Sequence, residues 1–198
     1  MLVFYKHRLV FLSVPKTGST AYETALAPHA DHVISDPPML KHAPVYRYNR
    51  WIRPMYERVC GIELETVAVM REPISWLGSW YRYRQRPFMR GQANATHEVS
   101  FDDFVLGYMK GKRPPYAEVG SQAKFLEPQP NGVGVDHQFR YETPGRLVAF
   151  LQDRLGVQIE TARENVSPQM PVHLSADVER RLRRKCAAEF ELYDGIAS

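Results

Sequence analysis

The segment from Leu9 to Ala27 places a tight polar loop between a short apolar run and a stretch without helix breakers. Leu9 to Val14 is rich in aliphatic and aromatic residues, which is typical of a buried strand. The loop from Pro15 follows at once, and Thr20 to Ala27 contains no Gly or Pro before Pro28, which predicts a helix. A loop between a buried strand and a helix points successive backbone N–H groups at one spot, where the helix dipole adds positive potential. The segment therefore predicts an anion site at the end of this strand.

A second strand, loop and helix unit follows further along the chain. Glu65 to Met70 (ETVAVM) is a short apolar run that ends at Arg71, and Pro73 opens the next helix in its favoured first-turn position. Leu2 to Tyr5 reads as one more strand. The alternation predicts an α/β fold with a mainly parallel central sheet flanked by helices, whose ligand lies at the carboxyl ends of the strands. Both loops are expected at that edge.

The rest of the chain predicts further helices separated by two irregular loops. Helices are expected after Ser100, which forms a capping signature with Asp103, and over Ser121 to Leu126. Two more are expected from Thr143, as cap, to the stop at Gly156, and from about Ser175. The loops lie near 86–100 and 111–134, and the whole of 1–198 is expected to form a single domain. An apolar stripe at helical spacing, with a kink or restart at Pro54, is interpreted as core: Val45, Tyr48, Ile52, Met55 and Val59.

Composition narrows the class of protein. The N-terminal apolar run is too short to cross a bilayer and no signal peptidase site follows it, so a cytoplasmic protein without a membrane span is expected. Cys60 and Cys186 lie far apart without metal-ligand spacing, which favours reduced thiols and no metal site. The formal charge of +4 suits an anionic ligand but does not separate a nucleotide from nucleic acid or a sulfated glycan.

The loop SVPKTGST carries donors for a phosphate without matching a Walker A motif. Gly18 permits close approach of the backbone, Ser19 and Thr20 add hydroxyl donors, and Lys16 adds a positive charge. A Walker A motif needs Lys directly after its second Gly, whereas Lys16 precedes Gly18 by two positions. A nucleotide triphosphatase usually places Asp at the end of a later strand to hold Mg²⁺, whereas ETVAVM is followed by Arg71. Arg at that point favours a second phosphate.

In these two segments the chain resembles the sulfotransferases that use 3′-phosphoadenosine 5′-phosphosulfate. The 3′-phosphate segment of that family places Arg at a strand end and Ser eight residues later, as do Arg71 and Ser79. Its 5′ loop often reads P-K-T/S-G-S/T-T/S, which is matched here by Pro15, Lys16, Thr17, Gly18, Ser19 and Thr20. The resemblance implies a P-loop-like sulfotransferase architecture and an enzyme that transfers a sulfuryl group from this donor to an acceptor hydroxyl, less favourably an amine, without a metal.

The resemblance also implies roles for individual residues. Arg71 and Ser79 would hold the 3′-phosphate, and the loop would hold the 5′ side, with Lys16 stabilising the charge on the leaving group. His42 is the candidate catalytic base, because neutral imidazole takes a proton near pH 7 and the family often has a His after its first helix. Glu23 on the first helix is the second candidate.

Weaker similarities cover later landmarks and support the fold more than the chemistry. They are Ser121-Gln122, Arg140-Tyr141-Glu142, Asn165-Val166-Ser167 and Phe190 to Asp194. Gln122 and Asn165 are as well suited to fixing a loop as to touching a ligand.

Two other functions stay open. The first is a P-loop kinase that acts on a small molecule with ATP and Mg²⁺. The second is a noncatalytic protein that binds nucleic acid or another anion, suggested by the Arg-rich stretches, although Arg180 to Lys185 is interpreted as a solvated helix face and nucleic acid is the less favoured partner. Carbohydrate, lipid and small-molecule acceptors are all compatible with the sequence, as is any oligomeric state.

Overall fold

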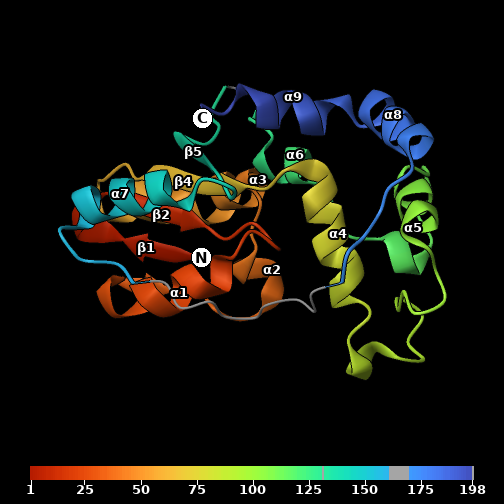
Figure 1. Ribbon diagram of the computed structural model, residues 1–198. Coiled ribbons are helices and arrows are strands. Elements are labelled where there is room, and N and C mark those ends of the chain that lie inside the picture. The colour runs from red at the N-terminus through yellow and green to blue at the C-terminus, as the bar shows by residue number, and fades with distance from the viewer. Residues whose placement is uncertain (131, 161–169, 198) are drawn as a thin grey trace. The chain divides into compact units, whose positions relative to one another are not determined.

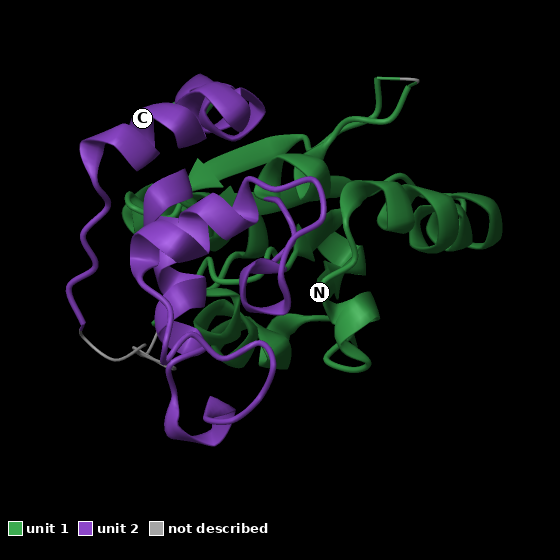
Figure 2. Cartoon of the chain, turned by 90° about the vertical axis from the view of Figure 1, so that its right-hand side faces the viewer, with its two compact units in different colours: residues 1–71, 122–165, 196–198 green, residues 72–121, 166–195 purple. Residues whose placement is uncertain are grey.

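The computed structural model describes all of residues 1–198 except 131, 161–169 and 198 (Figure 1). The chain divides into two compact units, each built from separate stretches of sequence (Figure 2). Unit 1 comprises 1–71, 122–165 and 196–198, and unit 2 comprises 72–121 and 166–195. The single domain expected from the sequence stays a prediction.

Unit 1 contains a mixed sheet, which has five strands among the described residues. In spatial order these are β3 (His32–Val33), β1 (Leu2–Phe4), β2 (Leu9–Leu12), β4 (Glu65–Met70) and β5 (His137–Arg140). β1 pairs antiparallel with β2, to which a tight turn joins it, and it also pairs antiparallel with β3. The β2–β4 and β4–β5 pairs are parallel. The predicted α/β class is confirmed. The predicted mainly parallel sheet is not confirmed, because the described sheet has as many antiparallel as parallel strand pairs.

The helices of unit 1 flank this sheet. The two longest, α1 (Ser19–Leu26) and α7 (Pro144–Leu155), pack on one sheet face, where Tyr22 and Leu151 join Phe11 and Val67 in one buried cluster (Figure 1). As predicted, α7 ends at Gly156 with a φ of 69°, but Thr143 forms no side-chain cap. The shorter helices are η1 (Tyr5–His7), η2 (Ala27–His29), α2 (Pro38–Lys41), α3 (Val45–Arg47), η3 (Tyr48–Ile52), η4 (Met55–Val59) and α6 (Gln122–Leu126).

The stripe interpreted as core is only partly buried. Val45 and Tyr48 are buried, but Met55 and Val59 are 47% and 80% exposed, so the prediction is wrong for these two. The reason is the π-helical winding of η3 and η4, which lie on either side of Pro54. Bonds from residue i to i+5 give a wider turn, so residues three or four apart drift off one face.

Unit 2 is helical in its described part. Its elements are α4 (Pro73–Tyr83), η5 (Pro87–Met89), α5 (Phe101–Tyr108), η6 (Pro115–Ala117), α8 (Ala176–Lys185) and α9 (Ala187–Gly195). The predicted cap of α5 is confirmed, because the Ser100 hydroxyl accepts the Asp103 N–H at 3.1 Å. A buried cluster joins Trp76, Phe104 and Leu182 from three of these helices. None of the described helices combines the length and the apolar character needed to cross a membrane.

Arg84, directly after α4, ties an irregular loop of unit 2 to the helix. The side chain is 7% exposed, and its two terminal nitrogens donate to the carbonyl oxygens of Pro115 and Glu118, each at 2.7 Å. Both acceptors lie in the segment 111–134 that the sequence marks as irregular. A single buried guanidinium therefore orders this part of the loop.

Replacing Arg84 with Lys is expected to lower the free energy of unfolding by about 2 kcal/mol, because one ammonium cannot serve both carbonyls and leaves a buried acceptor unpaired. Urea denaturation of the full chain measures this change. Arg90→Lys, at an exposed position after η5, is the matched control and should change the value by less than about 0.5 kcal/mol. Equal effects of the two substitutions would contradict the role given to Arg84.

Candidate functional site

The loop between β2 and α1 is held in a tight, left-handed conformation. Val14 N–H donates to the Leu12 carbonyl at 3.0 Å, and the buried Thr17 hydroxyl donates to the Val14 carbonyl at 2.8 Å. Gly18 has a φ of 74° and Lys16 a φ of 68°. Glycine adopts this region freely, but a residue with a side chain does so at a cost of about 1–3 kcal/mol. Strain of this kind occurs often at functional sites, which makes the loop a candidate for one.

The first turn of α1 presents its backbone donors to this loop. α1 begins at Ser19 with Gly18 as its N-cap and no side-chain cap. The N–H groups of an opening turn have no acceptor within the helix. Among the described residues, no other backbone acceptor is assigned to the N–H groups of Thr17, Gly18, Ser19 or Thr20. These donors, together with the positive end of the helix dipole, suit a phosphate.

Arg71 lies beside this loop because its backbone is clamped. Its N–H donates to Gln122 Oε1 at 2.9 Å, and Gln122 Nε2 donates to the Arg71 carbonyl at 2.8 Å. Gln122 is fully buried in α6, so the amide fixes the chain where β4 ends. Arg71 Nη1 in turn donates to the Lys16 carbonyl at 3.3 Å. The structure thus brings Arg71 and the loop together. Of the two roles that the sequence allowed for Gln122, fixing a loop or touching a ligand, these bonds match the first.

Tyr141 completes this group, and the sequence did not single it out as a site residue. Its N–H donates to the Met70 carbonyl at 2.8 Å, which places it directly after β5 beside the end of β4. The Arg71 guanidinium lies 4.4 Å from the centre of its ring. A Cβ at Gly18 would approach Tyr141 Cε2 to 3.2 Å, so glycine also makes room for this ring. The one sequence signal that pointed to Tyr141 was the weaker family similarity of Arg140-Tyr141-Glu142.

His42, directly after α2, is oriented as a neutral base. Its Nδ1 lies 2.7 Å from the Ser13 carbonyl oxygen, which only accepts hydrogen bonds, so Nδ1 carries the proton and Nε2 keeps its lone pair. Burial lowers the pKa of the imidazole, a lowering that the bond to Ser13 opposes and the neighbouring Lys41 charge increases. A pKa below the ordinary value leaves His42 neutral near pH 7.

Glu23, the alternative base, is surrounded by donors. Its Oε2 lies 2.6 Å from Lys41 Nζ, and its Oε1 accepts from the Ser13 hydroxyl at 2.9 Å and the Met1 ammonium at 3.3 Å. Burial raises the pKa of the carboxyl, but these bonds and charges together outweigh it, so the pKa is lower than usual. A carboxylate held in this way is a weak base, and the geometry favours His42.

Ser79, the other residue predicted to hold the 3′-phosphate, belongs to unit 2, where it is buried in α4. Asn165 and its neighbours lie outside the described residues. The gathered site of unit 1 therefore consists of the loop from Pro15 to Thr20 with Arg71 and Tyr141, and His42 is bonded to the Ser13 carbonyl at the start of the same loop.

The lowered pKa of Glu23 predicts a pH-dependent contribution to stability. Because the folded-state pKa lies below that of the unfolded chain, the contribution is complete above about pH 4.3 and is lost as the pH falls through the folded-state value. Glu23→Gln should lower the free energy of unfolding by about 1–2 kcal/mol at pH 7 and by progressively less below pH ~4. Urea denaturation across this range measures the difference. The exposed Glu63→Gln control should show little change, and a Glu23→Gln deficit that grew towards low pH would refute the prediction.

Comparison with known proteins supplies no relative from which a function could be transferred. No family model matches the chain, and searches of curated proteins and of solved structures returned no match. The residues gathered at the ends of β2, β4 and β5 in unit 1 are therefore the basis for a proposed function.

Proposed function

We propose that this chain is a sulfotransferase that takes its sulfuryl group from 3′-phosphoadenosine 5′-phosphosulfate and passes it to an acceptor hydroxyl. The observation that carries the proposal is the group formed by the loop and Arg71 at the carboxyl ends of two parallel strands. The loop offers backbone donors and Lys16 for one phosphate, and Arg71 offers a guanidinium for another. A nucleotide with phosphates at both ends matches that arrangement. We place the chain in a P-loop-like architecture and in the cytoplasm as part of the same proposal.

The residues of unit 1 divide the chemistry between them. His42 Nε2 takes the proton from the acceptor hydroxyl as the acceptor oxygen bonds to sulfur and the bond from sulfur to the bridging oxygen breaks. Lys16 and the N–H groups of Thr17 to Thr20 stabilise the negative charge that develops on the departing phosphate. Tyr141, stacked on Arg71, limits the directions in which that guanidinium can turn. Ser79 belongs to unit 2, and its part in holding the 3′-phosphate stays an implication of the resemblance.

Calorimetry with 3′-phosphoadenosine 5′-phosphate tests the donor site. The wild-type chain should bind this product, and Lys16→Ala and Arg71→Gln should each weaken binding by about tenfold or more, since each removes a charge-assisted contact to phosphate. Lys6→Ala is the control, because it removes the charge of an exposed lysine in η1 whose Nζ lies 3.8 Å from Asp31 Oδ1. This variant should bind the ligand as the wild type does. Tighter binding of ATP with Mg²⁺ than of this ligand would instead favour a P-loop kinase.

The pH dependence of turnover tests the base. Because the pKa of His42 is lowered, the acid limb of kcat/KM should lie below pH 6.5, where the imidazole becomes protonated and can no longer accept a proton. His42→Asn should lower kcat by about 100-fold or more and remove that limb, while leaving the binding of 3′-phosphoadenosine 5′-phosphate in place. His29→Asn, at an exposed position in η2, should leave the profile unchanged. An acid limb that survives in His42→Asn would assign the base to another residue.

A further inference from the structure

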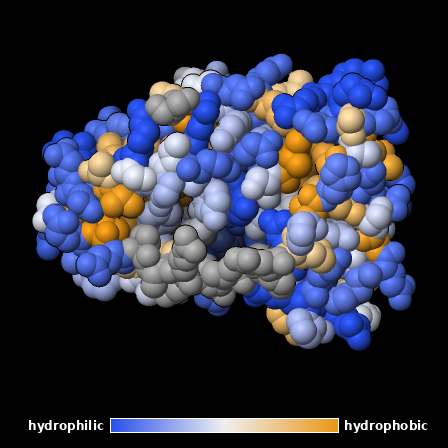
Figure 3. All heavy atoms as spheres, in the orientation of Figure 1, coloured by the Kyte–Doolittle hydropathy of each residue, from blue (hydrophilic) through white to orange (hydrophobic). Residues whose placement is uncertain are grey.

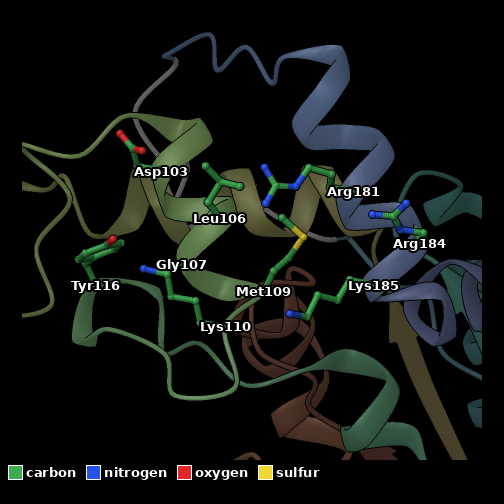
Figure 4. Close-up of a pocket in the computed structure, with 9 residues that line it drawn as sticks. All are labelled: Asp103, Leu106, Gly107, Met109, Lys110, Tyr116, Arg181, Arg184 and Lys185. Atoms are coloured by element: carbon green, nitrogen blue, oxygen red, sulfur yellow. The ribbon is translucent and has the colours of Figure 1, made fainter.

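Unit 2 contains a pocket of its own, with a volume of about 600 Å³, between α5 and α8 (Figure 4). We call it the α5–α8 pocket. Volumes of this size accommodate compact organic molecules. The pocket shares no residue with the loop, Arg71 or His42, so binding of a ligand there does not depend on the proposed function.

Four cationic side chains from two segments line this pocket. Lys110 follows α5, and Arg181, Arg184 and Lys185 come from the last two turns of α8 (Figure 4). One carboxylate, Asp103, also lines the pocket, but its Oδ2 accepts from the Ser100 hydroxyl at 2.6 Å as part of the α5 cap. The lining therefore carries a clear excess of positive charge.

The cations of α8 fall into two sets according to their ion pairs. Arg180 pairs with Asp177 at 3.2 Å, and Arg183 pairs with Glu179 at 2.8 Å, both within the helix. The three α8 cations that line the pocket, Arg181, Arg184 and Lys185, form no ion pair with any carboxylate in the part of the chain that the structure describes. The interpretation of Arg180 to Lys185 as a solvated face thus describes Arg180 and Arg183 well, but the other three share a pocket.

Helix electrostatics alone does not account for this sorting. Cations are stabilised near a helix C-terminus by about 0.3–1 kcal/mol wherever they lie around its last turn. That effect does not explain why the acids of α8 pair with Arg180 and Arg183, whereas Arg181, Arg184 and Lys185 line the same pocket as Lys110. Such an arrangement is maintained against like-charge repulsion, which an anion in the pocket would relieve.

Apolar and aromatic groups line the same pocket. Leu106 and Met109 lie on the side of α5, and Figure 4 shows Arg181 extending towards them from α8. Tyr116 of η6 lies close to α5 because Gly107 leaves room for it: a Cβ at that position would meet Tyr116 Cε2 at 3.0 Å. An occupant that uses the whole lining needs an apolar surface as well as negative charge.

The region around α8 is strongly hydrophilic at the surface, at the upper right of the space-filling view (Figure 3). All four cations of the pocket are exposed. A long polyanion such as nucleic acid would prefer a continuous cationic strip, whereas here Asp177 and Glu179 interrupt the charge along α8. The convergence of the cations on a confined volume favours a small molecule.

We propose that the α5–α8 pocket binds a small organic anion with at least two negative charges on an apolar or aromatic body, as in a phosphate monoester of an aromatic alcohol. Arg181, Arg184, Lys185 and Lys110 contact the charged group, and Leu106, Met109 and Tyr116 contact the body.

The probe is 4-nitrophenyl phosphate, titrated by calorimetry into the full-length Lys16→Ala protein so that the loop of unit 1 does not compete. Binding is expected, and 4-nitrobenzyl alcohol, which lacks the charge, should not bind. Inorganic phosphate, which lacks the ring, should bind at least about fivefold more weakly than the probe, because the apolar contacts are missing. Equal affinities for inorganic phosphate and the probe would overturn the part given to the apolar lining.

A matched pair of double variants locates the binding. Arg181→Gln with Arg184→Gln should weaken binding of the probe by about tenfold or more, whereas Arg180→Gln with Arg183→Gln removes the same charge from the same helix and should change it by less than about threefold. Circular dichroism and thermal unfolding check that both variants remain folded. Equal losses in the two variants, or no binding of the probe, would overturn the proposal. So would tighter binding of a ten-residue deoxythymidine oligonucleotide than of the probe, since it would indicate a polymer site.

Discussion

The parallel register of β2 and β4 is the constraint on which the candidate site depends. Leu12 lies opposite Ala68, so the loop that leaves β2 and the chain that leaves β4 emerge at one edge of the sheet. Arg71 is then within reach of the Lys16 carbonyl, and Gln122 locks its backbone there through two hydrogen bonds. The pairing of β4 with β5 adds Tyr141 at the same edge. Without this register, the loop and the arginine would be two unrelated local features.

The sequence predicts the parts of this site that arise locally. The strands around Leu9 and Glu65, the helix start at Pro73 and the Ser100 cap follow from apolar runs, Pro positions and capping residues within a few positions. The first helix was predicted from Thr20 and begins one residue earlier, at Ser19. β5 escaped prediction because its sequence, HQFR, is polar and half-buried along its whole length. The Gln122 clamp escaped because it joins residues 51 positions apart, and no local pattern encodes such a contact.

The two candidate bases illustrate what sequence spacing leaves open. His42 and Glu23 both lie close to Ser13, and each bonds to it, His42 at the carbonyl oxygen and Glu23 at the hydroxyl. The Ser13 carbonyl fixes a tautomer of His42, and burial disfavours the charged imidazolium. The Ser13 hydroxyl joins Lys41 in favouring the charged form of Glu23. Burial thus keeps the His42 imidazole neutral, whereas Ser13, Lys41 and the Met1 ammonium keep the Glu23 carboxylate ionised. Of the two, the neutral imidazole nitrogen takes a proton more readily.

Arginine has a different role at each of four places in this chain, so the net charge of the chain is a poor guide to function. Arg84 is buried and orders a loop through two carbonyls, and Arg183 is neutralised by Glu179 on its own helix. Arg71 is fixed at its backbone and stacked on an aromatic ring, which holds the guanidinium in place at low cost in side-chain entropy. Arg181 lines a pocket with three other cations. Groups that are held in place before a ligand arrives lose less entropy on binding, which is why the donor site that we propose is built around Arg71.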